Sequence, residues 1–234
     1  MYYLRPAQER GRANFGWLDS KHTFSFGHYY DPKHMGFSVL RVINDDTVRA
    51  GAGFDTHGHR DMEIISYILE GAIEHRDSMG NKFVVPAGEV QRMSAGTGVT
   101  HSEYNHSKTE NLKFLQIWIQ PNKRGVEPSY QQKKIEQTEQ LTPLVTPNGH
   151  DNSLTIQQDA SLYRLQLNAG ESFILETESK PCYLHIIDGG LTINDSQQLN
   201  NGDGLGAFQE TLEIRSGNDG VTALWFDLPN SKSV

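Results

Sequence analysis

Residues 51–63 read GAGFDTHGHRDME, and this stretch decides both how the chain folds and what it can bind. His57 and His59 are two residues apart, so on a β-strand both imidazoles point to the same face. Two imidazoles that converge in this way suit a transition metal such as Zn, Cu, Fe or Ni. The chain has 10 histidines, so one such spacing is weak evidence when taken alone.

A second pair, His101-Ser-Glu103, again places its members two residues apart and combines a nitrogen ligand with a carboxylate. Two strands that each present such a pair into a barrel could supply four ligands to one metal ion. Glu63, at the end of the first stretch, is a further carboxylate of this kind. The residues alone do not choose between Glu63 and Glu103.

The segments around these pairs are short and alternate between apolar and polar residues. This period of two is typical of strands that bury one face in a core. Four such segments are residues 37–43, 112–119, 162–167 and 221–228. Turn signals rich in glycine, proline and aspartate separate them. Many short strands with frequent turns predict an all-β barrel or sandwich.

The segment from Pro128 to Gln140 differs, because it is polar, lacks glycine and is rich in helix formers, which predicts a short helix or an ordered linker. The two flanking units echo each other weakly, as in Ile68-Leu-Glu-Gly71 and Ile186-Ile-Asp-Gly189, which favours an internal duplication. We therefore predict three parts. These are an N-terminal metal-binding barrel over 1–126, a helical linker over 127–145 and a C-terminal barrel over 146–234.

The spacing around the two pairs resembles the motifs of the cupin family. The residues that fit the first motif are Gly51, His57, His59 and Glu63, and Gly71 follows one residue late. The residues that fit the second motif are Gly80, Pro86, Gly88, His101 and Asn105. The gap between Gly88 and His101 is much longer than in typical cupins. A long glycine-rich insert that ends in His-Ser-Glu resembles the pirins, which are members of the cupin superfamily.

The resemblance to pirins covers essentially all of the first half of the chain and is specific. Its motifs are Phe15-Gly-Trp17, Phe24-Ser-Phe26, Tyr67-x-Leu-Glu-Gly71, His75-x-Asp-Ser-x-Gly80 and the run from Gln91 to Glu103. The second half resembles the C-terminal barrel of pirins more loosely, and the whole chain is most similar to short bacterial pirin-like proteins. This resemblance implies an all-β bicupin, with two jelly-roll barrels of the double-stranded β-helix type.

The pirin resemblance also implies a ligand set, which falls on His57, His59, His101 and Glu103. It leaves Glu63 outside the ligand set, where its carboxylate could accept a bond from a ligand imidazole. In the second barrel the two histidine positions hold Leu175 and Thr177, so no metal ligands are expected there. We expect one divalent transition-metal ion, with Fe first and Cu, Ni, Mn, Zn or Co as alternatives.

Pirin-like proteins resemble quercetin 2,3-dioxygenases, which open the central ring of a flavonol with O2 and release carbon monoxide. The resemblance therefore implies an oxidoreductase that takes O2 and a small aromatic, flavonol-like substrate. In this interpretation Glu103 is both a ligand and the general base that accepts the proton of the flavonol 3-hydroxyl. Four protein ligands leave at least one coordination position open, as catalytic sites do.

Two other functions remain open at this point. Some pirins look like metal-dependent or redox-dependent regulators that bind a protein partner, and the acidic charge would allow a basic one. A sugar or small-molecule isomerase is a third interpretation, because cupins host many chemistries. The insert that ends in His101 and Glu103 makes the isomerase the least favoured of the three.

Other histidines and the single cysteine have structural interpretations. His75 and Asp77 lie near a turn and are expected to form a local hydrogen bond. His22, His28 and His34 lie in an aromatic-rich segment that is expected to pack against a barrel and could share in a pocket wall. His185 is expected to be packed or exposed, and Cys182 to be a small buried apolar group.

The composition limits which molecules and which compartment are expected for this protein. The formal charge of 21 − 29 = −8 argues against binding to nucleic acids or anionic lipid. No apolar stretch approaches the length of a membrane span, and residues 1–10 show no signal peptide. One cysteine cannot form an intrachain disulfide, so nothing indicates an oxidising compartment. We therefore expect a cytoplasmic protein.

Overall fold

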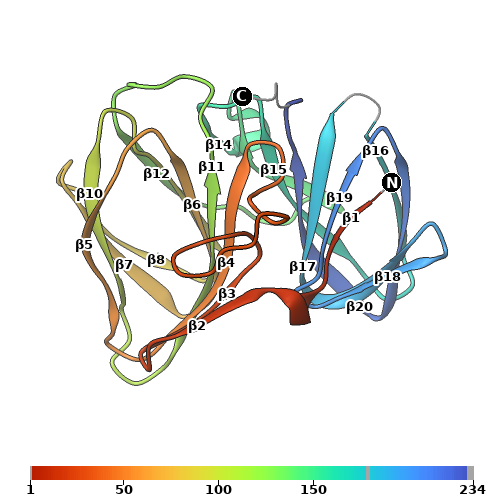
Figure 1. Ribbon diagram of the computed structural model, residues 1–234, viewed down its shortest axis with the longest axis horizontal. Helices are drawn as coiled ribbons and strands as arrows, with labels where there is room; N and C mark the ends of the chain where they lie inside the picture. The colour runs from red at the N-terminus through yellow and green to blue at the C-terminus, as the bar shows by residue number, and fades with distance from the viewer. Residues whose placement is uncertain (1, 178–179, 231–234) are drawn as a thin grey trace. The chain divides into compact units, whose positions relative to one another are not determined.

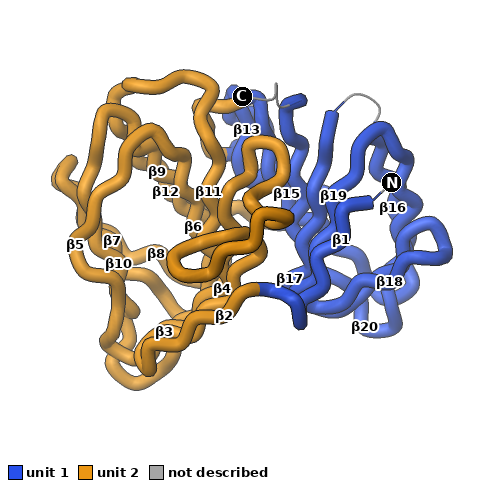
Figure 2. Tube along the Cα trace, in the orientation of Figure 1, with its two compact units in different colours: residues 1–10, 137–153, 159–234 blue, residues 11–136, 154–158 orange. Residues whose placement is uncertain are grey.

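The chain forms two compact units in the computed structural model, which describes residues 2–177 and 180–230 (Figure 2). Unit 1 comprises residues 1–10, 137–153 and 159–234, and unit 2 comprises residues 11–136 and 154–158. The described part of the chain is almost entirely β, so the expected all-β class is confirmed. None of its helices is long and apolar enough to cross a membrane.

Unit 2 contains two antiparallel sheets. The larger sheet has the order β12-β9-β6-β11-β4-β3-β2. Its strands are β2 (Gly11–Asn14), β3 (Leu18–His22), β4 (Leu40–Val48), β6 (Glu63–Glu70), β9 (Glu89–Ser94), β11 (Leu112–Ile119) and β12 (Ser129–Lys134). The smaller sheet has the order β5-β10-β7-β8. Its strands are β5 (Gly53–His59), β7 (Ala72–Asp77), β8 (Lys82–Pro86) and β10 (Val99–Asn105).

The two sheets of unit 2 face each other, with β5, β7 and β10 opposite β4, β6 and β11 (Figure 1). At one end of the space between them, Phe114 of β11 and Ile73 of β7 belong to one apolar cluster. At the other end, Trp118 of β11 packs against a cluster that contains Val99 of β10. Because alternate residues share a face, Gln116 also points between the sheets, at the level between the two clusters.

A row of polar residues crosses the larger sheet at the level of Gln116. Register makes direct neighbours of His22 and Asn44, of Asn44 and Gln116, of Gln116 and Ser66, and of Ser66 and Gln91. All but Gln116 are buried. We call these five residues, from β3, β4, β11, β6 and β9, the polar row. It places hydrogen-bonding groups inside an otherwise apolar interior.

The prediction of a helix between Pro128 and Gln140 is wrong. Residues 129–134 form strand β12, which pairs with β9 from Ser129 opposite Ser94 to Lys134 opposite Glu89. The side-chain amide of Gln132 donates to Glu89 at 2.5 Å and to the Val84 carbonyl at 2.9 Å. These tertiary contacts outweigh the weak helix propensity of the segment.

Unit 1 contains one large antiparallel sheet with the order β1-β19-β17-β20-β15-β13, while β16 pairs with β20 and β18 with β17. The strands are β1 (Tyr3–Arg5), β13 (Leu141–Thr146), β15 (Ser161–Leu167), β16 (Ser172–Glu176), β17 (Pro181–Ile193), β18 (Gln197–Asn200), β19 (Gly204–Phe208) and β20 (Thr211–Asp227). The short elements are η1 (Ala7–Glu9) in unit 1, η2 (His150–Asn152) in unit 1 and β14 (Leu154–Thr155) in unit 2.

The unit boundaries differ from the predicted division at 126 and 146 in three places. The predicted linker is divided, because residues 127–136 belong to unit 2 and residues 137–145 to unit 1. The first ten residues join unit 1, because β1 pairs with β19. Residues 154–158 join unit 2, where the guanidinium of Arg92 donates to the carbonyl of Thr155 at 2.7 Å. Chain order alone gives no sign of either exchange.

Four residues of unit 1 for which no metal-binding role was expected are buried. Cys182 is buried in this core, and burial raises the pKa of its thiol to about 12. His185 is packed inside β17 rather than exposed. Leu175 lies in the core and Thr177 is buried. These are the two positions at which the sequence predicted the loss of the histidines.

Candidate metal centre

Strand β10 organises the centre, because it pairs with β5 on one side and with β7 on the other. It carries His101 and Glu103, which are two apart and therefore point to the same face. His57 of β5 lies directly opposite His101, and His75 of β7 lies directly opposite Glu103. Four potential ligands thus meet on three adjacent strands.

Two features of β5 and β10 bring these side chains together. The register shifts between His101 and Glu103, which is the mark of a β-bulge. At Gly53 the two backbones come so close that a Cβ atom would lie 2.4 Å from the Glu103 carbonyl oxygen. Only glycine fits such an approach, so residue 53 helps to hold β5 against the ligand-bearing part of β10.

Three imidazole nitrogens converge at the centre. The Nε2 atom of His101 lies 3.0 Å from Nε2 of His59 and 3.1 Å from Nε2 of His57. The ring centroids of His57 and His59 are 4.8 Å apart. His101 is buried, His59 is half-buried and His57 is partly exposed, so the cluster reaches from the interior toward solvent.

The tautomer of His57 can be assigned from its neighbour. Its Nδ1 atom lies 2.7 Å from the backbone carbonyl of Asp55. Because a carbonyl only accepts, Nδ1 carries a proton, so in the neutral tautomer Nε2 keeps its lone pair. The ring therefore presents an unprotonated nitrogen to the cluster, as a metal ligand must.

The environment keeps the other two imidazoles neutral. Burial, aided by His101 and His57, lowers the pKa of His59 to about 4. Burial also lowers the pKa of His101 below its ordinary value, although the nearby Glu103 opposes this shift. Neutral imidazole is the form that binds metal ions.

The spacing of the nitrogens fits one bound ion. Two nitrogens at about 2.1 Å from one ion and about 90° apart would lie about 3.0 Å from each other. The two distances from His101 Nε2, 3.0 and 3.1 Å, match this value. One proton on His101 Nε2 can serve only one of its two neighbours at a time, whereas one cation satisfies all three lone pairs.

Glu103 lies beside this cluster rather than within the same close group. Its carboxylate shares a second group of potential ligands with His75 and His101. The polar row holds it there: Gln116 donates to Oε2 at 2.9 Å, and Ser66 donates to Oε1 at 3.3 Å. His101 belongs to both groups, so it links Glu103 to His57 and His59.

Glu63 has other partners. Its Oε2 atom accepts hydrogen bonds from the Ser94 hydroxyl at 2.8 Å and from the Gln157 backbone N–H at 3.3 Å. Burial raises the pKa of the Glu63 carboxyl above its ordinary value. Neither group of potential ligands among the described residues includes Glu63, and its two donors are not imidazoles.

His75 makes more contacts at the centre than the sequence indicated. The expected local bond is present, because Nε2 of His75 lies 3.0 Å from Oδ2 of Asp77 and both side chains are buried. The same ring packs on Tyr130 with centroids 4.7 Å apart and lies 5.4 Å from the ring of His101. His75 thus supports the inner side of the centre. Its position opposite Glu103 could have been inferred only from the strand register.

Comparisons with known proteins identify similar sequences and structures. The Pirin family model matches residues 4–119, and the model of the quercetinase C-terminal cupin domain matches residues 143–228. Quercetin 2,3-dioxygenase of Escherichia coli (strain K12) is 49% identical over 231 residues, which are 98% of this chain and 99% of that protein.

Two solved structures are similar over essentially the whole length. YhhW from Escherichia coli has a TM-score of 0.95 and 48% identity, with 100% of both chains covered. The structure of the bacterial pirin YhhW in complex with nickel(II) has a TM-score of 0.93 and 48% identity, and covers 98% of this chain and 99% of that one.

Proposed function

The chain belongs to the pirin family of cupin proteins, and we propose that it is a metal-dependent dioxygenase of the quercetin 2,3-dioxygenase type. Its reaction would open the central ring of a flavonol with O2. The expected oxidoreductase class agrees with the name of the E. coli relative. The observation that carries the proposal is the convergence of three imidazoles beside a buried carboxylate.

The proposed ligands are His57, His59, His101 and Glu103. The first three already present their Nε2 atoms to one point, and Glu103 is within reach of His101. A divalent transition metal held there lowers the pKa of a hydroxyl that binds it, and so favours the deprotonated form. The partial exposure of His57 leaves that side of the centre open to a substrate.

Glu103 would also act as the general base. A carboxylate oxygen beside the centre can accept the proton that leaves the flavonol 3-hydroxyl. Gln116 and Ser66 donate to the two oxygens of Glu103, so the carboxylate is held in one orientation. On the other side, Asp77 and Tyr130 fix the ring of His75, which keeps the wall behind Glu103 rigid.

For the metal we propose iron. Imidazole together with carboxylate and an open position is the ligand type of non-haem iron oxygenases. The nickel(II) complex of YhhW supports a divalent ion in a related protein. The same ligands accept several metals, so the ion that supports turnover has to be found by reconstitution.

The test combines metal content with oxygen consumption. Protein stripped of metal and reloaded with Fe(II), Ni(II), Cu(II) or Mn(II) would be assayed for O2 uptake on quercetin. We expect about one ion per chain and uptake that disappears in the double variant His57→Ala/His101→Ala. A fully loaded protein that consumes no O2 with any flavonol would refute the dioxygenase.

The regulatory interpretation gains no specific observation, and a protein partner stays a prediction. We also propose a cytoplasmic location. Its support is the single cysteine, which is buried in the core of unit 1 and so is not available for a disulfide.

A further inference from the structure

Unit 2 contains a cavity of about 550 Å³ that the metal centre does not account for. It lies against β2, β3, β4, the start of β5 and the segment between β3 and β4. The residues that line it are Arg12, Ala13, Phe15, Trp17, Leu18, Ser20, His22, Phe26, Gly27, His28, Tyr29, Asn44, Asp46 and Phe54. Its volume lies within the usual range for small-molecule sites.

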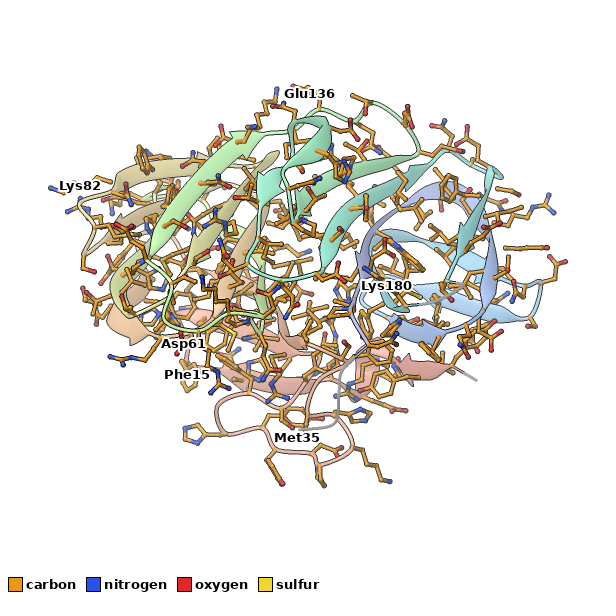
Figure 3. The ribbon with its side chains drawn as sticks, turned by 90° about the horizontal axis from the view of Figure 1, so that it is seen from above. Phe15, Met35, Asp61, Lys82, Glu136 and Lys180 are labelled. Carbon is orange, nitrogen blue, oxygen red and sulfur yellow. The ribbon has the colours of Figure 1, made fainter. Side chains whose placement is uncertain are left out.

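Aromatic rings form much of the wall. Trp17 and Phe54 meet edge to face with centroids 5.1 Å apart. The ring of Phe15 is 58% exposed and stands on the outside of the unit, at the edge of the cavity (Figure 3). Walls of this kind bind a flat aromatic ring through stacking and edge-to-face contacts.

The inner side of the cavity is polar. Ser20 of β3 lies opposite Asp46 of β4, and His22 lies opposite Asn44. Register therefore places all four side chains on one face, where they form a block two residues wide and two long. All four are buried. We call them the polar block.

In the polar block, Ser20 and Asp46 are hydrogen-bonded to each other, whereas His22 and Asn44 each have an unpaired polar atom. The hydroxyl of Ser20 donates to the carboxylate of Asp46. Among the described residues, neither Nδ1 of His22 nor Oδ1 of Asn44 has a hydrogen-bond partner, although both atoms are buried. Burying such atoms unpaired is costly, so a ligand that supplies the missing bonds is favoured.

The cavity adjoins the metal centre by two routes. Asn44 lies next to Gln116, which donates to Glu103. Phe26 contacts Trp118 with centroids 5.3 Å apart, and Trp118 packs on His59 at 5.1 Å. Gln116 and Trp118 therefore connect the lining of the cavity to the metal centre.

We propose that this cavity binds a hydroxylated aromatic ring of the substrate, and that His22 and Asn44 select rings that carry hydroxyl groups. The proposal rests on the dioxygenase function and names its substrate class as polyphenols. A phenolic hydroxyl can donate to Oδ1 of Asn44, and Nδ1 of His22 can donate to or accept from a second hydroxyl. An aromatic ring without hydroxyls would leave both atoms unpaired, and such mismatches are strongly rejected.

The test compares two flavonols that share the 3-hydroxyl but differ in the outer rings. Dissociation constants of quercetin and of 3-hydroxyflavone would be measured on the metal-loaded protein without O2, so that no turnover occurs. We expect wild type to prefer quercetin by at least about tenfold. Asn44→Leu and His22→Phe keep side chains of similar shape and remove the polar atoms of that side chain, including the unpaired one, so each should cut this preference several-fold.

Asn122→Leu is the matched control, because it makes the same change at an exposed position outside the cavity. It should leave the preference unchanged. Retained binding of 3-hydroxyflavone by the two cavity variants shows that they are folded. An unchanged preference in both variants, equal weakening of the two flavonols, or no binding by wild type would each overturn the proposal.

Oxygen uptake separates this proposal from the proposed function. A preference that falls in the variants, combined with no uptake on quercetin by wild type, would sustain the polyphenol site and refute the dioxygenase. Normal uptake by wild type with an unchanged preference in the variants would refute the role of His22 and Asn44 alone.

Discussion

Glu63 and Glu103 are two buried carboxylates with different neighbours. Glu103 stands beside His101, whereas Glu63 is bound by Ser94 and Gln157. We predict that Glu103→Gln weakens metal binding by about 100-fold or more, because an amide is a poorer ligand than a carboxylate. Glu63→Gln should cost less than about tenfold. Metal affinity measured by titration with a competing chelator checks both.

The two variants control each other, because each replaces one buried glutamate by the same neutral residue. Retention of metal by Glu103→Gln, with loss in Glu63→Gln, would reverse the assignment of the carboxylate ligand. That reversal would make the ligand set of this chain that of a typical cupin.

Asp46 offers a test of the electrostatics inside unit 2. Burial, opposed by the Ser20 hydrogen bond and aided by neighbouring acids, raises the pKa of Asp46 to about 7. The folded protein therefore holds this proton while the unfolded chain, with a pKa near 4, releases it. The contribution of Asp46 to stability is complete below about pH 4 and is lost as the pH rises to about 7.

Asp46→Asn removes this dependence. We predict that the variant gains stability over wild type between pH 4.5 and pH 8, by up to roughly 4 kcal/mol. Urea unfolding of the metal-free proteins at several pH values measures the difference. Asp219→Asn, the same change at an exposed position of unit 1, is the control. A difference between Asp46→Asn and wild type that does not change with pH would contradict the account.

At the scale of the strand, members of the polar row hold Glu103 in place through hydrogen bonds to its carboxylate. Gln116 is the central member of the row, since it donates to Glu103 and lies between Asn44 and Ser66. We predict that Gln116→Leu lowers metal affinity by about 10-fold to 100-fold, because the carboxylate loses its orienting donor. Competition titration against Gln166→Leu, the same change at an exposed position of unit 1, measures the effect. Equal affinities in the two variants would exclude this role.

The sequence contains a signal for this row that alternation alone does not explain. In β11, Gln116 interrupts an inward series that otherwise holds Leu112, Phe114 and Trp118. In β4, Asn44 and Asp46 follow Val42 and precede Val48 in the same way. A polar residue on the apolar face of a strand marks an internal site. Which of these residues become neighbours depends on register, and the sequence does not state the register.

The pairs His57/His59 and His101/Glu103 could be predicted because a strand repeats every two residues, and the ring nitrogens of His57 and His59 do converge on that of His101. Strand β12 could not be predicted, because Tyr130 and Gln132 take their conformation from partners far away in the chain. Tyr130 stacks on Phe83 at 5.2 Å, and Gln132 bonds to Glu89. Local propensity carries no information on such contacts.

At the scale of the whole molecule, metal should stabilise the folded chain. The proposed ligands come from β5 and β10, which are adjacent only in the fold, so the unfolded chain has no equivalent site. We predict that metal at about 100 times its dissociation constant adds about 2.7 kcal/mol to the stability of the wild type. Thermal unfolding with and without chelator measures this. The double variant His57→Ala/His101→Ala should show no shift, and an equal shift in it would place the metal elsewhere.

The most direct test of the central claim is anomalous diffraction at the absorption edge of the metal, from crystals of the metal-loaded protein. The account predicts one strong peak, bonded to Nε2 of His57, His59 and His101 and to an oxygen of Glu103, at about 2.0–2.2 Å. A peak held by Glu63, a peak between His75 and Glu103 that leaves His57 and His59 unbound, or no peak at all would contradict it.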